Sequence, residues 1–172
     1  MQKFILALTL GLLAWTGPAN ADGHAKETKD VTFAKQLWQT LIQQKLVGPD
    51  RVNVQPFKGN EPHGSIQQVV GTKITVNGLS GKVVIKANHG GKDISVQNVY
   101  SNPNKHLGAY TIMFQREKGY DAANQNWFWA KYNAKGQVDK TPKGAPIAGR
   151  VASCIGCHKA IGGADLETLT EK

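Results

Sequence analysis

The amino-acid sequence predicts an α+β domain built mainly on an antiparallel β-sheet. One early stretch has the apolar periodicity of a helix, and at least four later stretches are rich in β-branched or aromatic residues. The connections between these stretches are rich in Gly, Asn and Pro, and the one over residues 77–81 is short. Strands joined in this way pair antiparallel, because a parallel pair needs a long crossover. Near the C-terminus we expect a short helix that carries the only two cysteines of the chain.

The N-terminus has the pattern of a secretory signal peptide. Lys3 precedes an apolar run over residues 4–15, and Ala19-Asn20-Ala21 has the A-x-A form of a cleavage site. This run is too short to span a membrane, and no later segment approaches about 20 apolar residues, so we expect no membrane span. The pattern predicts an exported protein, located in the periplasm of a bacterium. The expected organisation is a signal peptide over residues 1–21, a flexible leader over 22–29 and a single domain over 30–172.

The first predicted helix covers residues 30 to about 47. Phe33, Leu37 and Leu41 recur at helical spacing and fall on one face, and Gly48-Pro49 ends the segment. An apolar face of this kind usually packs in the core.

A long connection of irregular structure is predicted over residues 48–65. Loops of this length are often functional. Phe57 suits the apolar wall of a binding pocket, whereas His63 is either a ligand or a surface residue. For His63 the surface position is favoured.

Two β-rich segments then form a predicted hairpin. They cover residues 66–76 and 83–85, and the turn lies over residues 77–81. The two-residue period of a strand places Val84 and Lys86 on the same face.

Two further strands follow a connection predicted over residues 88–105. The first covers residues 109–115, and the second, residues 127–132, is the most aromatic segment of the chain. Alternation places Trp127 and Trp129 on one face of the second strand.

The segment Cys154-Ile155-Gly156-Cys157-His158 has the attachment pattern of a c-type haem. Positions i and i+3 lie on one face of a helix, so Cys154 and Cys157 can both reach the two vinyl groups of one porphyrin. His158 is then placed beneath the iron as its axial ligand, a role that suits imidazole. The motif therefore predicts one covalently bound haem c.

Other uses of a cysteine pair are less consistent with the sequence. A thioredoxin-type pair begins a βαβ unit, and only 14 residues follow His158. A zinc site needs four ligands, and there is no second cysteine pair. A structural disulfide remains open, although it gives no reason for the adjacent histidine.

Five segments together give the sequence a resemblance to the cytochrome P460 family. They are Pro62-His63-Gly64, Val83-Val84-Ile85-Lys86, Lys118-Gly119-Tyr120-Asp121, the run from Asn126 to Tyr132, and the haem motif at Cys154 to His158. The resemblance covers most of the chain from the first helix onward. It implies an antiparallel sheet with flanking helices, and a homodimer.

The resemblance also implies roles for two strand residues. In the catalytic P460 cytochromes a lysine at the position of Lys86 is bonded to a porphyrin meso carbon, whereas the alternative for Lys86 is an ordinary solvent-facing lysine. The hydroxylamine-oxidising members carry a distal glutamate at the position of Thr111, and a threonine is no general base at neutral pH. This departure favours the related cytochromes c′-β, which bind nitric oxide or carbon monoxide in apolar distal pockets.

The sixth coordination position of the iron is predicted to be open or weakly occupied. Met113 is the only methionine after the signal peptide, and it lies in mid-strand, where methionine usually fills the core. No histidine among His24, His63, His89 and His106 has a context that singles it out. The candidates for the distal pocket are Phe57, Thr111, Met113, Phe114, Trp127 and Trp129.

The chain carries 21 Lys and Arg against 12 Asp and Glu, a net charge of +9. The lysines are scattered, so we expect no nucleic-acid partner but a basic surface that attracts a soluble, acidic redox partner.

The sequence predicts a haem protein that binds or oxidises small nitrogen species such as hydroxylamine and nitric oxide. The alternative is a six-coordinate electron-transfer cytochrome in which Met113 or a histidine completes the iron.

Overall fold

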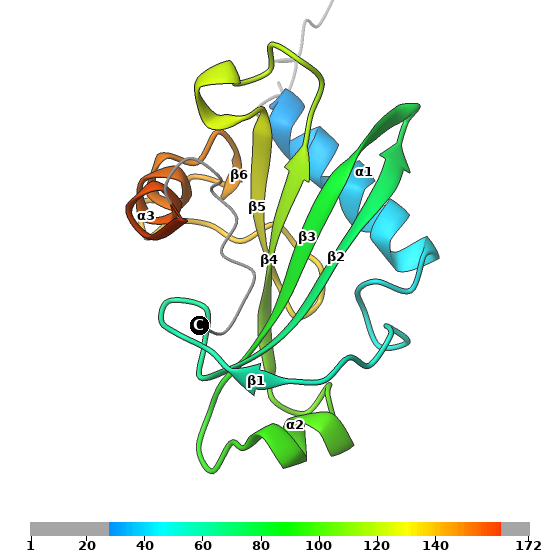
Figure 1. Cartoon of the computed structure of the whole chain (residues 1–172), viewed down its shortest axis with the longest axis vertical. Helices are drawn as coiled ribbons and strands as arrows, with labels where there is room; N and C mark the ends of the chain where they lie inside the picture. Colours follow the sequence, from blue (N-terminus) through cyan, green and yellow to red (C-terminus); the bar gives the residue numbers. More distant parts are fainter. Residues whose placement is uncertain (1–27, 163–172) are drawn as a thin grey trace, which may run out of the picture.

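The computed structural model of the chain describes residues 28–162, and the expected signal peptide lies outside them (Figure 1). The elements are α1 (Lys29–Gln43), β1 (Phe57–Lys58), β2 (Ile66–Val76), β3 (Leu79–His89), α2 (Val96–Ser101), β4 (Leu107–Gln115), β5 (Trp127–Asn133), β6 (Ala148–Gly149) and α3 (Ala152–Gly162). The strands form one antiparallel sheet in the order β1-β2-β3-β4-β5-β6. An α+β fold with a helix at each end of the described chain is therefore confirmed.

Each strand pairs with the next one along the chain, and β2 and β3 are joined by a tight hairpin turn. The turn between β2 and β3 is Asn77-Gly78, with φ of 49° and 81° at the two residues. Two-residue turns with positive φ at both positions match the twist of a hairpin, and Asn-Gly is their preferred sequence. The turn is thus shorter than predicted, and β3 is correspondingly longer.

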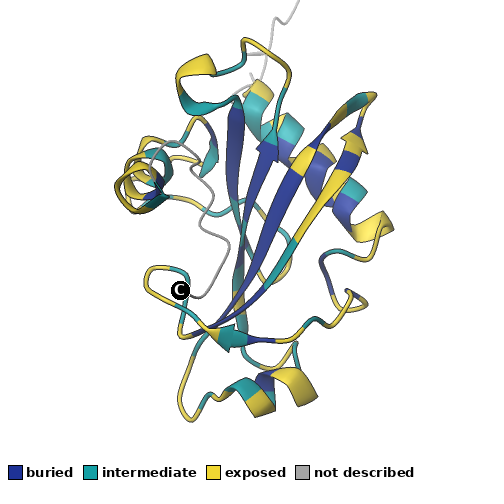
Figure 2. Ribbon diagram, in the orientation of Figure 1, coloured by how far each residue is buried: buried dark blue, intermediate teal, exposed yellow. Residues whose placement is uncertain are grey.

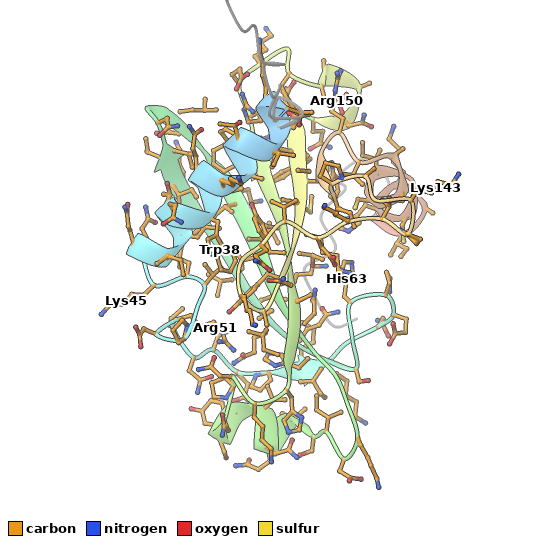
Figure 3. The ribbon with its side chains drawn as sticks, turned by 180° about the vertical axis from the view of Figure 1, so that it is seen from behind. Trp38, Lys45, Arg51, His63, Lys143 and Arg150 are labelled. Atoms are coloured by element: carbon orange, nitrogen blue, oxygen red, sulfur yellow. The ribbon has the colours of Figure 1, made fainter. Side chains whose placement is uncertain are left out.

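Helix α1 covers one face of the sheet and forms the main core with it (Figures 1 and 2). Ala34, Leu37 and Leu41 of α1 are fully buried there against the strands. Trp38 lies between α1 and the sheet (Figure 3), where its ring centroid is 4.9 Å from that of Tyr132. Burial of these large apolar side chains is the main free-energy term that holds α1 on the sheet.

The boundaries of α1 differ from the prediction at both ends. Thr28 caps the helix by accepting a hydrogen bond from the Val31 amide at 3.3 Å, so α1 begins at Lys29, inside the segment that was predicted to be a leader. The helix ends at Gln43, because Lys45 has a left-handed φ of 55°. The helix is therefore shorter at its C-terminal end than the apolar pattern predicts.

Two short elements lie in connections that were predicted to be irregular. β1 adds two residues to the edge of β2, where Phe57 pairs with Gln67. α2 begins at a capping box in which Ser95 and Asn98 exchange hydrogen bonds. Both elements are too short to show a hydrophobic period in the sequence.

The second face of the sheet carries a separate apolar cluster made by Val84, Met113, Trp127 and Trp129. Cross-strand pairing sets Val84 opposite Met113 and Met113 opposite Trp129. The predicted alternation is therefore confirmed, since Trp127 and Trp129 share this face while Phe128 lies in the α1 core. Within residues 28–162, no helix is long and apolar enough to cross a bilayer.

Candidate functional site

A cavity of about 230 Å³ lies on this second face, between the sheet and α3. Residues of β3, β4 and β5 form its floor, α3 forms one wall, and the loop before β2 contributes Pro62 and His63. The cavity is also lined by the two thiols and the imidazole of the haem motif, which belong to Cys154, Cys157 and His158. The sheet, the helix and the loop thus meet at one site.

Helix α3 is held by apolar contacts with the sheet. Val151, Cys154 and Ile155 pack against the cluster on the second face. His158 is only 5% exposed, and its ring centroid lies 4.7 Å from that of Trp129, with the planes at 74°. These contacts turn the inner side of α3 toward the cavity.

The two cysteines occupy different environments within the same helical turn. Cys154 is half-buried and Cys157 is exposed, and both thiols are free. Burial raises the pKa of the Cys154 thiol above its ordinary value, so this group is protonated at neutral pH. The free thiols do not support a structural disulfide between Cys154 and Cys157. The strand before α3 is β6, which pairs antiparallel with β5, whereas a thioredoxin-type cysteine pair belongs to a βαβ unit with parallel strands.

The floor of the cavity consists of two cross-strand rows. The apolar row contains Val84, Met113 and Trp129, and the polar row contains Lys86, Thr111 and Lys131. Neighbouring side chains in such a row are about 5 Å apart at their Cβ atoms. Lysine, hydroxyl and apolar groups therefore lie close together beside the thiols.

Lys86 is buried and lines the cavity, with 6% of its surface exposed. A solvent-facing lysine at this position is therefore ruled out. Burial lowers the pKa of Lys86 below its usual 10.5, and the nearby Cys157 acts in the opposite direction. Lys86 thus lines the same cavity as Cys154, Cys157 and His158.

His63 also lines the cavity, and the surface interpretation favoured from the sequence was wrong. Its Nδ1 shares a hydrogen bond of 3.2 Å with Thr111 Oγ1, which also accepts one of 3.2 Å from Asn88 Nδ2. Burial, followed by the charges of Lys86, His158 and Lys131, lowers the pKa of His63 to about 4. The imidazole is therefore neutral near pH 7. The signal that could have found it is its place in Pro62-His63-Gly64, one of the segments on which the suggested resemblance to the P460 family rests.

The six candidates for the distal pocket are distributed over both faces of the sheet. The cavity is lined by Thr111, Met113 and Trp129. Trp127 belongs to the apolar cluster on this face of the sheet but does not line the cavity. Phe114 is on the opposite face, in the α1 core, with its ring centroid 5.7 Å from that of Phe33. Phe57 is half-buried in β1 and does not line the cavity.

Lys131 and Ile147 line the cavity but were missed by sequence reasoning. Lys131 could have been found, because it continues the alternation that places Trp127 and Trp129 on this face. Its ammonium group lies 2.9 Å from the Asp139 carboxylate. Ile147 precedes the two-residue strand β6, for which the sequence gives no periodic signal.

The residues present fit a covalently held haem. Two thiols one helical turn apart and a buried imidazole border a cavity with an apolar floor, as the attachment of a porphyrin through its vinyl groups requires. The indole Nε1 of Trp129 is buried and has no hydrogen-bond partner within the described chain, so it can donate to a bound molecule.

Comparisons with protein-family models, with curated proteins and with solved structures give no match. The chemistry of the site must therefore be inferred from the residues around the cavity. The most informative of these are the cysteine pair, His158, His63 and Lys86.

Proposed function

We propose that the protein is a c-type cytochrome of the P460 type, in which one haem is covalently held in this cavity. The observation that carries the proposal is that α3 turns Cys154, Cys157 and His158 toward a cavity with an apolar floor. Attachment adds each S–H group across a vinyl double bond and needs no oxidant. His158 would supply a nitrogen to the iron, and the packing of its ring on Trp129 holds the orientation of that ring.

A bound haem supplies a redox-active iron to which small ligands coordinate. We propose that these ligands are small nitrogen species, with nitric oxide binding favoured over hydroxylamine oxidation. Among residues 28–162, no carboxylate lines the cavity, so this part of the chain offers no carboxylate base for a proton released from hydroxylamine. Val84, Met113 and Trp129 exclude water from the apolar side.

The setting of the protein belongs to the same proposal. The signal-peptide pattern in residues 1–21 supports export to the periplasm, and the charge of +9 supports a soluble, acidic redox partner. The P460 resemblance supports a homodimer.

The second candidate function is electron transfer through a six-coordinate iron. Both Met113 and His63 line the cavity, so each is a potential sixth ligand. A carrier would keep this ligand permanently, whereas a ligand-binding protein would not.

An optical spectrum of the reduced protein, with and without carbon monoxide, tests the proposed function. We expect carbon monoxide to shift the spectrum, because a small ligand can reach the iron. Failure of fully haem-loaded protein to bind carbon monoxide or nitric oxide would instead support the electron carrier. Turnover of hydroxylamine with an artificial electron acceptor would show that the protein is an oxidase.

Lys86 is proposed to border the haem and to bond a porphyrin meso carbon, as the resemblance implies. The bond removes one hydrogen from Nζ and one from the carbon, a two-electron oxidation for which peroxide is the oxidant. Burial supports this role, because a lowered pKa increases the fraction of the nucleophilic neutral amine.

Replacement of Lys86 by Met is expected to abolish the cross-link while an apolar chain of similar length fills the space. Proteolysis of the unmodified protein should give a haem peptide that joins residues around Lys86 to the cysteine motif. Lys86→Met should lose that peptide and the accompanying red shift of the Soret band. The matched control is Lys131→Met, which removes the other lysine of the same row and should leave both unchanged. A haem peptide from the unmodified protein that lacks residues around Lys86 would contradict the cross-link.

A further inference from the structure

Two histidines from distant parts of the chain meet at the cavity. His158 comes from α3, and His63 comes from the loop before β2. Their ring centroids are 6.1 Å apart, and the ring planes are at 84°. Figure 1 shows that α3 and this loop lie on the same side of the sheet, one above the other.

The loop that carries His63 is held in place by its own hydrogen bonds and by β3. The Gly59 amide donates to the Ser65 carbonyl at 2.8 Å, and the His63 amide donates to the Asn60 carbonyl at 3.0 Å. Gly64 has φ of +83°, and a Cβ at this position would lie 2.6 Å from the His89 carbonyl oxygen. The loop therefore fits closely against the end of β3, which fixes the position of the preceding His63.

The His63 ring is oriented by the sheet. Its Nδ1 forms a hydrogen bond with Thr111 Oγ1, and the side-chain amide of Asn88 also donates a hydrogen bond to that oxygen. This arrangement leaves Nε2 for a second partner. A metal-bound histidine characteristically uses one ring nitrogen for the metal and the other for a hydrogen bond that fixes the ring.

The distance between the two rings matches a shared metal ion. With metal–nitrogen bonds of about 2 Å, two imidazoles on opposite sides of one ion have their centroids about 6 Å apart. The observed 6.1 Å agrees with this value. An angle of 84° between the planes is compatible, because each ring can rotate about its own metal–nitrogen bond.

Met113 is less suitably placed than His63. It is the cross-strand partner of Trp129, the residue on which the His158 ring packs. The Met113 side chain therefore leaves the sheet from the apolar row, next to the position of the His158 ring. His63, by contrast, is hydrogen-bonded to Thr111 of the next row.

We propose that His63 is the second axial ligand of the iron in the resting protein, and that a small ligand must displace it. This inference rests on the proposed haem attachment. In the tautomer in which the Nδ1–H group donates to Thr111 Oγ1, Nε2 carries the lone pair that would form the bond, and no proton is transferred. The loop around His63 thereby controls access to a sixth position that the sequence suggested was open.

The replacement His63→Ala tests the proposal through the spin state of the ferric protein, measured by optical and electron paramagnetic resonance spectra. The unmodified protein should be low-spin and His63→Ala high-spin, and added imidazole should restore the low-spin spectrum. His106→Ala is the control, because His106 is also half-buried but does not line the cavity. It should remain low-spin.

Carbon monoxide binding to the reduced protein gives a second measurement. The rate should reach a limit set by release of His63 and should rise about tenfold or more in His63→Ala, since only the displaced fraction binds ligand. Thr111→Val, which removes the hydrogen bond to Nδ1 but keeps the ligand, should raise the rate by a smaller factor.

The haem content of each preparation separates this inference from the proposed function. Protein without covalent haem would overturn both. Haem-loaded protein that is high-spin, or that stays low-spin in His63→Ala, would overturn the role of His63 and leave haem attachment intact.

Discussion

Replacement of both Cys154 and Cys157 by Ser is expected to abolish covalent haem retention. The two thiols are on the cavity side of α3, and no other cysteine is present in the sequence to take their place. Serine is close in size to cysteine, and Cys157 is exposed, so the helix should persist. After acidic organic extraction, haem should stay with the unmodified protein and leave the double variant.

The matched control for this experiment is Gly156→Ala, between the two cysteines. Within residues 28–162, apart from the neighbouring residues and backbone of α3 itself, no atom lies within 4 Å of a Cβ at this position. Alanine stabilises a helix interior relative to glycine by roughly 0.5–1 kcal/mol. This variant should keep its haem. Covalent retention in the double variant, or an unmodified protein whose mass shows no haem after maturation in a host that attaches haem c, would contradict the site.

Gly136→Ala is expected to destabilise the fold strongly. Gly136 has φ of +82°, and its Cβ would overlap the indole of Trp38. Trp38 cannot move aside, because it is packed between Tyr110 at 5.3 Å and Tyr132 at 4.9 Å between ring centroids. Backbone strain and overpacking together should cost about 3–5 kcal/mol of unfolding free energy.

Gly144 offers a control with the same backbone conformation. Its φ is also +82°, but apart from its two chain neighbours no atom of the described residues lies within 4 Å of a Cβ there. Gly144→Ala should therefore lose only the strain of the left-handed conformation, about 1 kcal/mol. Urea unfolding of the two variants measures the difference. Equal losses would show that Trp38 does not restrict this turn.

Local sequence pattern was sufficient for the long elements of the fold. The strand period correctly assigned Val84 and Lys86 to one face, and the same period separated Trp129 from Phe128. The pattern could not say which face carries the site. Phe114 was proposed for the pocket because it is aromatic, yet its side chain packs under α1.

The short elements were beyond the reach of the sequence. β1 exists because Phe57 and Lys58 pair with the start of β2, and such pairing depends on a partner that is distant from any local window. Lys86 illustrates the same limit of prediction from local sequence. Its spacing placed it on a strand, but only the packing of α3 over that face shows that it is buried.

The sequence by itself determined the first helix, the main strands, the hairpin between β2 and β3, and the spacing of Cys154, Cys157 and His158. Each of these depends on residues only a few positions apart, and steric and hydrogen-bonding preferences act at that range. The tertiary structure alone decided that His63 and Lys86 share a cavity with His158. That proximity depends on strand order and on the closure of a loop against β3, which join segments far apart in the chain. The segment from Cys154 to His158 predicted the wall of the site that α3 forms. Only the folded structure showed which residues of the sheet and of the loop before β2 form the rest of the site.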